Sequence, residues 1–390
     1  MPGVTGFTAP PLVQTVGRVA YLGPPGTFTE EALLSQHDLA EGELVAMRTM
    51  PDVLAATASG EVDFGFVALE NSIEGTVRMV LDGLIFEHDL LMQREVVLHI
   101  RQNLLAPPGT TVADVRRVVS FPDVVGQCRR FLSTSLPGVE FVAANSTAEA
   151  ARVVAESGSP GTAALGTALS AQLYGLEVLA AHVEDHPENQ TRFVVLAGHG
   201  IPAPTGHDKT TIVCFQHTDR PGSLHAILGQ FSARNINLTH LSSRTTKRSL
   251  GEYCFFIDLE GHVDDEVVAD CLRDLHAQLP DVKFLGSYPA AGEHGPAIRR
   301  DAEESWRRAD EWIADLRRQV ARHGLDAEAL GHGDVGRAGG PLFGAAGQEH
   351  QGAHGDRQAE GVGFEPTGLS PKAFQEPRIR PLCHPSCRRA

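Results

Sequence analysis

Thr191 and Arg192 lie side by side in the segment NQTRF at 189–193, which follows an acidic, turn-prone run and leads into the apolar run 193–196. A hydroxyl that can reach a reacting atom is thus presented beside a guanidinium that can hold a carboxylate through two parallel hydrogen bonds. Alone, such a pair is more often a turn with a solvated arginine. Three other segments favour the same chemistry, which is the binding and turnover of a small organic anion.

These three segments each place polar side chains where an apolar run ends. They are YLGPPGTFTE at 21–30 with Thr27, LENSIEGTV at 69–77 with Asn71 and Ser72, and SFPDVVGQC at 120–128 with Ser120 and Gln127. In open α/β sheets, ligands bind just beyond the carboxyl ends of the strands. Each segment also has a local explanation, because Thr27, Ser72 and Ser120 could simply cap helices.

The elements that must position these residues alternate along the chain. Apolar runs predict strands, and amphipathic stretches between them predict helices that begin near residues 29, 51, 75, 122, 147 and 167, with Ser146 as an N-cap. This order predicts an α/β fold with mostly parallel sheets. The predicted strands are 18–22, 62–68, 96–100, 118–120, 139–143, 162–165 and 193–196.

The pattern changes after a Pro- and Gly-rich stretch at 198–208, which indicates a domain boundary. The order that follows, βαββαβ, predicts a small ferredoxin-like domain. A charged helix is expected over 301–321. Residues 331–390 contain 12 Gly and 6 Pro, which predicts a disordered tail over 325–390. The second-domain elements are strands 209–217, 237–245, 251–260 and 282–288 and helices 223–233 and 264–279.

Composition limits the partners of the protein. The net charge of −16 argues against nucleic acid or an anionic membrane as the main partner. Residues 1–17 lack Lys, Arg and a long apolar run, so we expect no secretory signal, and scattered cysteines are typical of reduced, cytoplasmic thiols. The single cluster CHPSC at 383–387 cannot complete a metal site, and neither a Rossmann fingerprint nor a Ser-His-Asp order is evident. We therefore expect no metal and no cofactor.

Taken together, the four motifs resemble those of the prephenate dehydratases, in their monofunctional form with a C-terminal ACT regulatory domain. The resemblance covers roughly residues 18–290. It implies a catalytic domain over 18–198 with two lobes of the periplasmic-binding-protein type and a cleft between them. The chain would cross twice, so that lobe one is about 18–99 plus 179–197. It also implies an ACT domain over 209–290.

The resemblance further implies an enzyme, a carbon-oxygen lyase that converts prephenate to phenylpyruvate in phenylalanine biosynthesis and is feedback-regulated by phenylalanine. It implies a cytoplasmic homodimer or homotetramer. The implied catalytic residues are Thr191, Asn71, Ser120 and Gln127, and the implied substrate-binding residues are Arg192, Ser72, Thr27 and Phe193. The implied effector residues are Gly222, Ser223, Leu224, Asn237, Ser243 and Arg244.

The sequence departs from the family pattern at three places. Phe121 stands where the family usually has His after the serine of the third motif. In the regulatory domain, GSL at 222–224 replaces Gly-Ala-Leu, and SSRT at 242–245 replaces Glu-Ser-Arg-Pro. The last change removes an acid and a proline from the effector motif.

Other interpretations remain open at this stage. The motifs do not separate prephenate from its amino analogue, so an arogenate dehydratase is one alternative. Two-lobed α/β proteins often only bind, so a non-catalytic small-anion-binding regulatory protein is another. A structural protein organised by its Gly-rich tail is a third.

Overall fold

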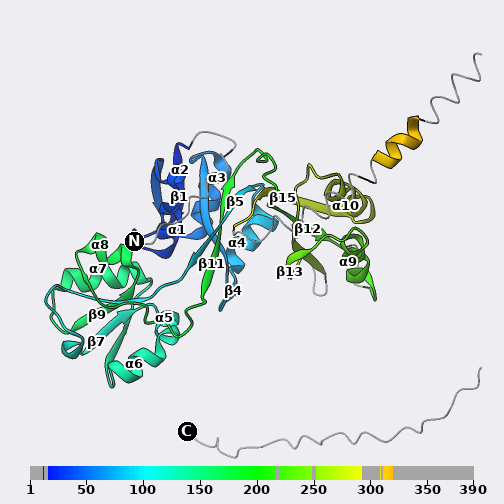
Figure 1. Cartoon of the computed structure of the whole chain (residues 1–390). Coiled ribbons are helices and arrows are strands. Elements are labelled where there is room, and N and C mark those ends of the chain that lie inside the picture. The colour runs from blue at the N-terminus through cyan, green and yellow to red at the C-terminus, as the bar shows by residue number, and fades with distance from the viewer. Residues whose placement is uncertain are drawn as a thin grey trace, which may run out of the picture. The chain divides into compact units, whose positions relative to one another are not determined.

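The computed structural model describes residues 12, 16–216, 220–247, 252–291, 308 and 311–318. They fall into three parts, each built on one sheet, which we call lobe one, lobe two and the C-terminal domain (Figure 1). Residues 308 and 311–318, within the expected charged helix, are helical. The expected tail over 325–390 lies outside the described residues.

Lobe one is a six-stranded sheet in the order β2-β1-β3-β11-β5, with β4 paired to β3. Strands β1, β2 and β3 are parallel, whereas β11 runs antiparallel to both of its neighbours, β3 and β5. The sheet is therefore mixed, and the expectation of mostly parallel sheets is corrected. The strands are β1 (Arg18–Leu22), β2 (Glu43–Met47), β3 (Phe64–Asn71), β4 (Gly75–Thr76), β5 (Leu91–His99) and β11 (Gln190–Ala197).

Helices cover both faces of this sheet. Apolar side chains of α1 (Phe28–Leu34) and α2 (His37–Ala40) pack on one face. Those of α3 (Met50–Ser59), α4 (Arg78–Asp82) and the π-helical turn η1 (Gly83–Glu87) pack on the other. Helix α3 begins at a capping box in which Thr49 and Asp52 each accept a backbone N–H from the other.

Lobe two is a five-stranded sheet in the order β10-β6-β9-β7-β8. Helices α7 and α8 pack on one face, and α5 and α6 on the other. Ser146 caps α7 by accepting the Glu149 N–H at 3.0 Å, as predicted. The elements are β6 (Asn103–Ala106), η2 (Val112–Asp114), β7 (Arg117–Ser120), α5 (Pro122–Gln127), α6 (Arg129–Ser135), β8 (Glu140–Ala143), α7 (Thr147–Ser157), β9 (Thr162–Gly166), α8 (Ala168–Tyr174) and β10 (Glu177–Ala180).

Strand β10 pairs with β6, so it belongs to lobe two and not to the returning part of lobe one, where residues 179 and 180 were expected. The chain crosses between lobes twice, and the two crossings are tied together. The Val183 N–H donates to the Gln102 carbonyl at 2.9 Å, and the Ile100 N–H donates to the Asn189 carbonyl at 2.8 Å. The buried Glu184 carboxylate accepts the Gln102 N–H and pairs with Arg101, both at 2.9 Å.

The C-terminal domain has the predicted βαββαβ order. Its antiparallel sheet runs β13-β14-β12-β15, and α9 and α10 contribute apolar side chains to its core. The α/β prediction with a ferredoxin-like C-terminal domain is confirmed. The elements are β12 (Asp208–Phe215), α9 (Ser223–Ala233), β13 (Leu238–Thr245), β14 (Tyr253–Glu260), α10 (Glu266–Gln278) and β15 (Asp281–Pro289).

The C-terminal domain shares a hydrophobic core with lobe one. Leu285 and Tyr288 of β15 and Phe256 of β14 cluster with Met92 and Leu196 of lobe one. At Gly286, whose φ is +132°, a Cβ atom would stand 2.6 Å from the Met92 carbonyl oxygen of β5. Only glycine permits this approach, so β15 lies directly on β5, as Figure 1 shows.

Among the described helices, none has the length and apolar character required to span a bilayer.

Candidate active site at the ends of strands β3 and β11

Thr191 and Asn71 are brought together by strand pairing. They are directly opposite one another in the antiparallel pair of β11 and β3. The Asn71 side-chain amide donates to the Thr191 hydroxyl oxygen at 2.9 Å. In the described part of the chain Thr191 donates its own hydroxyl proton to no group, and 8% of the residue is exposed. The Thr191 proton is therefore available to a molecule that reaches this hydroxyl.

Asn189 is a member of this cluster that the sequence interpretation did not assign. It is 2% exposed, and its side-chain oxygen accepts from the Asn71 amide at 2.9 Å and from the Ser72 hydroxyl at 3.2 Å. The Ser72 hydroxyl in turn accepts the Gln190 N–H at 3.0 Å. Ser72 thus braces the β3 and β11 ends and does not cap a helix. Asn189 is the first residue of the NQTRF motif, and this position was the one sequence feature that could have identified it as a site residue.

The turn after β3 connects the two lobes. The Asn71 side-chain oxygen accepts the N–H groups of Ile73 and Glu74 at 2.9 and 3.0 Å, which closes the turn. Gln127, at the end of α5 in lobe two, donates its amide to the Glu74 carboxylate at 3.2 Å. The second and third of these motifs, at 69–77 and 120–128, are thus in contact.

Ser120 is fully buried at the end of β7, and its hydroxyl has no hydrogen-bond partner among the described residues. It does not cap α5, because Phe121 occupies the N-cap position and makes no side-chain cap bond. A buried polar group without a partner costs free energy. The Ser120 hydroxyl therefore pays this cost within the described part of the chain, with its donor unused.

Thr27 is the N-cap of α1. Its hydroxyl accepts the Glu30 N–H at 3.3 Å and donates to the Leu22 carbonyl at 3.3 Å, so its hydrogen-bonding capacity is largely used within the loop. The same loop is held by lobe two, because the Thr167 hydroxyl donates to the Gly26 carbonyl and the Tyr174 hydroxyl to the Pro25 carbonyl, both at 2.8 Å. The GPPGTF segment is therefore a second contact between the lobes.

Arg192 lies on the opposite face of the sheet from Thr191. Its guanidinium pairs with Asp258 of β14 and Glu95 of β5 and donates to the Tyr288 hydroxyl at 2.9 Å. Burial alone lowers the pKa of Arg192, but the facing Asp258 carboxylate keeps it well above the usual value. The expected binding of a substrate carboxylate by Arg192 depends on the guanidinium lying on the same face of the sheet as Thr191. Successive strand residues point to opposite faces, and the structure does not place Arg192 at the site.

Phe193 is placed in the core of lobe one. It is 1% exposed and stacks on Phe66, with ring centroids 5.3 Å apart. This contact fixes β11 against β3 and leaves no ring surface for a substrate. We therefore assign Phe193 to positioning the strand that carries Thr191.

One of the expected effector residues at the start of α9, Ser223, contacts the side chain of Gln216. Gly222 is the N-cap with φ +88°, a conformation that favours glycine. The Ser223 hydroxyl donates to the Gln216 side-chain oxygen at 2.9 Å, while the buried Gln216 Nε2 has no partner among the described residues. Leu224 packs into the domain core. Gln216 was not recognised in the sequence, where it is one polar residue at a strand end.

The other expected effector residues are split between two surroundings. The Asn237 amide donates to the Glu260 carboxylate at 3.0 Å within the domain. Arg244 pairs with Asp82 of α4, so its guanidinium faces lobe one of its own chain. Ser243 lies beside it on β13, which is an edge strand of the sheet.

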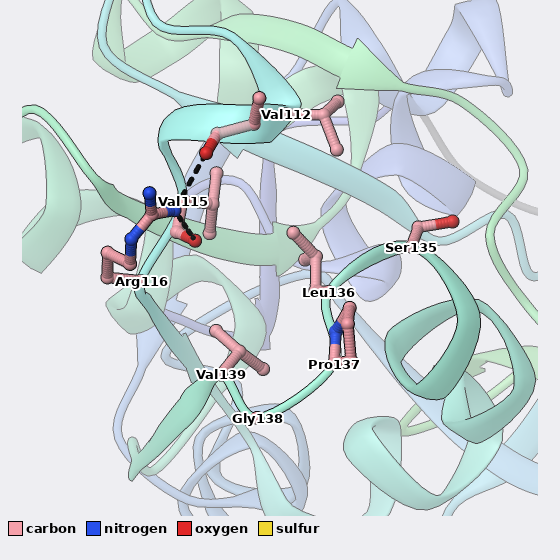
Figure 2. Close-up of a pocket in the computed structure, with 9 residues that line it drawn as sticks. Val112, Val115, Arg116, Ser135, Leu136, Pro137, Gly138 and Val139 are labelled. Carbon is pink, nitrogen blue, oxygen red and sulfur yellow. Dashed lines mark hydrogen bonds between the residues drawn. The ribbon is translucent and has the colours of Figure 1, made fainter.

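A cavity of about 280 Å³ lies elsewhere, in lobe two, lined by residues from 112–116 and 135–139 (Figure 2). None of the predicted site residues lines it. Its one charged group, Arg116, donates to the carbonyls of Ala113 and Val115 at 2.7 and 3.0 Å, so the guanidinium is already engaged. This cavity is not the predicted site.

Cysteine and metal chemistry have little support among the described residues. No group of three or more His, Cys, Asp or Glu side chains there could hold a metal ion. The four described cysteines are buried free thiols, and burial raises the pKa of Cys128 and Cys214 to about 12 and that of Cys254 and Cys271 to about 11. These thiols are protonated and are poor nucleophiles.

Comparison with known proteins gives the same domains. A prephenate dehydratase family model matches residues 19–200, and an ACT domain model matches residues 210–277. The prephenate dehydratase of Mycolicibacterium gilvum is 40% identical over 310 residues, which are 77% of this chain and 98% of the relative.

Two solved structures are similar over most of the chain. The prephenate dehydratase of Arthrobacter aurescens, in complex with L-Phe, is 35% identical with a TM-score of 0.68, over 77% of this chain and 99% of that one. A protein described as GqqA, a novel type of quorum-quenching acylase, is 29% identical with a TM-score of 0.63, over 70% of this chain and 98% of that one. The motifs, the two-lobed fold and the relative that this chain covers almost completely lead to one conclusion: this chain belongs to the prephenate dehydratase family.

Proposed function

We propose that this protein converts prephenate to phenylpyruvate, with loss of water and carbon dioxide, in phenylalanine biosynthesis. The observation that carries the proposal is the hydrogen bond from the Asn71 amide to the Thr191 hydroxyl. Because Asn71 donates to the threonine oxygen, it orients the Thr191 proton outward. The family motifs that contribute this pair occur in a chain 40% identical to a prephenate dehydratase.

The reaction needs orientation more than strong acid or base chemistry. The bond from the ring to the hydroxyl breaks, the bond to the ring carboxylate breaks, and the electron pair of that second bond completes the aromatic ring. The departing hydroxyl leaves as water and needs a hydrogen-bond donor as its charge develops. Thr191 is that donor, and it stabilises the developing charge or relays a proton, because a threonine hydroxyl is a very weak acid.

Two further residues help to orient the substrate in this proposal. The Ser120 hydroxyl, which has no partner among the described residues, donates to a substrate oxygen in this proposal. Gln127 holds the Ser120 segment next to the Asn71 turn through Glu74. The substrate then lies between the lobes, with its reacting carbon near Thr191.

A direct assay tests the proposal. Purified full-length protein is incubated separately with prephenate and arogenate, and phenylpyruvate and phenylalanine are measured as the respective products. A higher kcat/KM for prephenate than for arogenate supports the proposal, whereas a higher kcat/KM for arogenate would identify arogenate as the substrate. An N-acyl homoserine lactone serves as a control, because the relative described as an acylase shares the fold. Acyl hydrolysis without phenylpyruvate formation would contradict the proposal.

Phenylalanine is the proposed effector of the ACT domain. The relative from Arthrobacter aurescens was solved with L-Phe. In this chain the start of α9 offers free backbone N–H groups for a carboxylate, and the unpaired Gln216 amide lies beside Ser223. We also propose a homodimer or homotetramer in which ACT domains pair side by side through the β13 edge.

Titration calorimetry with phenylalanine, together with inhibition of turnover, tests the effector site. An effector acts only through different affinities for two states, so binding and inhibition must appear together. Gly222→Val should abolish both, because valine is strained at φ +88°, and basal activity without phenylalanine should persist. Wild-type protein that binds no phenylalanine at about 1 mM, or roughly 4 kcal/mol of binding free energy, would leave the ACT domain an assembly role alone.

A further inference from the structure

A buried cluster of charges joins the ACT domain to strand β11. Arg192 pairs with Asp258 of β14 and with Glu95 of β5, and Lys209 of β12 pairs with Glu95 at 2.7 Å. Two cations thus face two carboxylates. The Asp258 and Glu95 side chains are 0% and 2% exposed, so these pairs are shielded from water.

Hydroxyl groups of the ACT domain complete the cluster. Thr211 donates to the second Asp258 oxygen at 2.6 Å, and its hydroxyl bonds that of Tyr288, also at 2.6 Å. The Tyr288 hydroxyl accepts from Arg192 at 2.9 Å. The Arg192 guanidinium is therefore held by Asp258 and Tyr288 of the ACT domain and by Glu95 of β5.

This cluster is one residue away from the catalytic pair. In the pairing of β3 with β11, Arg192 stands opposite Glu70, and the next pair is Thr191 with Asn71. Glu70 is held as well, because His240 of β13 contacts its carboxylate at 3.2 Å. Both catalytic residues therefore have a backbone neighbour whose side chain is anchored in the ACT domain.

The anchor is rigid because the two domains share a core. Tyr288 packs with Leu196 and Met92 of lobe one, and Gly286 brings β15 onto the backbone of β5. A change in the position of β14 or β15 must therefore move Arg192 or break its pairs. Thr191 is the next residue on the same strand, so it follows such a displacement.

We propose that Arg192 and Asp258 are positioning residues for the dehydration, through which the ACT domain sets the orientation of the Thr191 hydroxyl. This assignment rests on the proposed role of Thr191. In this proposal Arg192 does not contact the substrate. Its function is to lock the end of β11 so that the Asn71–Thr191 hydrogen bond is made in the reactive geometry.

The test compares Asp258→Asn and Tyr288→Phe with Asp82→Asn in the full-length protein. Asp82 also pairs with the ACT domain, through Arg244, but from α4 and not from a catalytic strand. For Asp258→Asn we expect kcat to fall about tenfold or more while KM stays within about threefold, and for Tyr288→Phe we expect a loss of kcat of about threefold. Asp82→Asn should keep kcat within about twofold.

A double-mutant cycle separates positioning from general damage. In the Thr191→Ser background, whose smaller side chain is already less well oriented, Asp258→Asn should lower kcat by less than it does in the wild type. The inference would be overturned if the folded Asp258→Asn variant lost no more kcat than Asp82→Asn. It would also be overturned if the effects of Asp258→Asn and Thr191→Ser on kcat were fully additive. If Asp258→Asn does not fold, Tyr288→Phe decides in the same way. Wild-type protein without dehydratase activity would instead refute the proposed function.

Discussion

The two faces of the lobe-one sheet differ sharply where β11 begins. On the face of Thr191 the contacts are neutral, made by the side-chain amides of Asn71 and Asn189 and the hydroxyl of Thr191, whose proton has no acceptor within the described part of the chain. On the face of Arg192 the contacts are ionic and buried, and they are made by Asp258 of the ACT domain and Glu95 of β5. In our proposal these two adjacent residues have different functions: Thr191 takes part in the reaction, and Arg192 holds the strand.

The arginine beside the proposed catalytic threonine is thus engaged in a different set of contacts. A guanidinium in a shared core is already committed to Asp258, and releasing it would leave two buried carboxylates poorly compensated. Mutations on the two faces should therefore differ in their effect on stability. Changes at Thr191 should lower turnover and preserve stability, whereas changes at Arg192 should lower stability as well as turnover.

The largest expected effect is on the Thr191 face. Thr191→Ala should lower kcat about 10³-fold, because it removes the donor to the departing hydroxyl. Thr191→Ser keeps the hydroxyl and should retain much more activity. The free energy of unfolding should change by no more than about 1 kcal/mol, since the site is at a strand end. Steady-state kinetics and urea unfolding measure both quantities.

Near-normal turnover in Thr191→Ala would remove Thr191 from the reaction. Equal damage in the alanine and serine variants would instead show that the methyl group and its packing matter.

The next effect is on the Arg192 face. Arg192→Met should reduce the free energy of unfolding by about 3–5 kcal/mol, because Asp258 and Glu95 lose their shared cation inside the protein. The matched control is Arg244→Met, whose pair with Asp82 is more exposed and should cost about 1 kcal/mol or less. Equilibrium urea unfolding compares the two. Similar small losses in both variants would contradict the view of Arg192 as a buried anchor.

Much of the fold could be predicted from the sequence, because local signals and tertiary structure agree there. The strand at 18–22 matches β1, and Ser146 caps α7 as its spacing with Glu149 indicates. Strands β2, β6 and β10 were missed. They are only four or five residues long, their apolar runs are correspondingly short, and β2 and β10 are edge strands with exposed residues.

The site was predicted less completely, since it depends on contacts far apart in the chain. Because side chains alternate along a strand, the sequence indicates that Thr191 and Arg192 point to opposite faces of the sheet. Only the folded chain shows that Asp258, 66 residues after Arg192, pairs with the guanidinium on the Arg192 face. Phe193 reads equally well as core or as substrate contact until its stacking on Phe66 is known. The absence of a partner for Ser120 within the described residues is likewise a tertiary property.

Ser120, in lobe two, provides a further test of the neutral face of the proposed site. Ser120→Ala removes a buried hydroxyl that has no partner in the described structure, so the free energy of unfolding should stay unchanged or rise by up to about 1 kcal/mol. The kcat/KM for prephenate should fall about tenfold, the equivalent of one lost hydrogen bond in the transition state. Ser133→Ala, at an exposed serine of α6, is the control and should change neither. A destabilised Ser120→Ala with normal kcat/KM would indicate a structural hydroxyl.

The smallest expected effect concerns His240 and Glu70, at the edge of the ionic face. The contact with Glu70 raises the pKa of His240, and the same contact lowers the pKa of Glu70. A raised histidine pKa stabilises the fold fully below the unfolded value of about 6.5, and this contribution is lost as pH rises through the folded value. A lowered carboxyl pKa stabilises the fold above the unfolded value of about 4.3, and this is lost as pH falls through the folded value.

The pair should therefore contribute most between about pH 4.5 and pH 6.5, where both groups are charged in the folded protein. His240→Gln should cost about 1 kcal/mol or less in that window, and the cost should shrink toward pH 9. Urea unfolding of both proteins across this range measures the difference, with His276→Gln, at an exposed position of α10, as the control. A cost that does not vary with pH would mean that His240 acts through its edge-on packing against the Phe256 ring, so that Arg192 alone carries the ionic link to the catalytic strand.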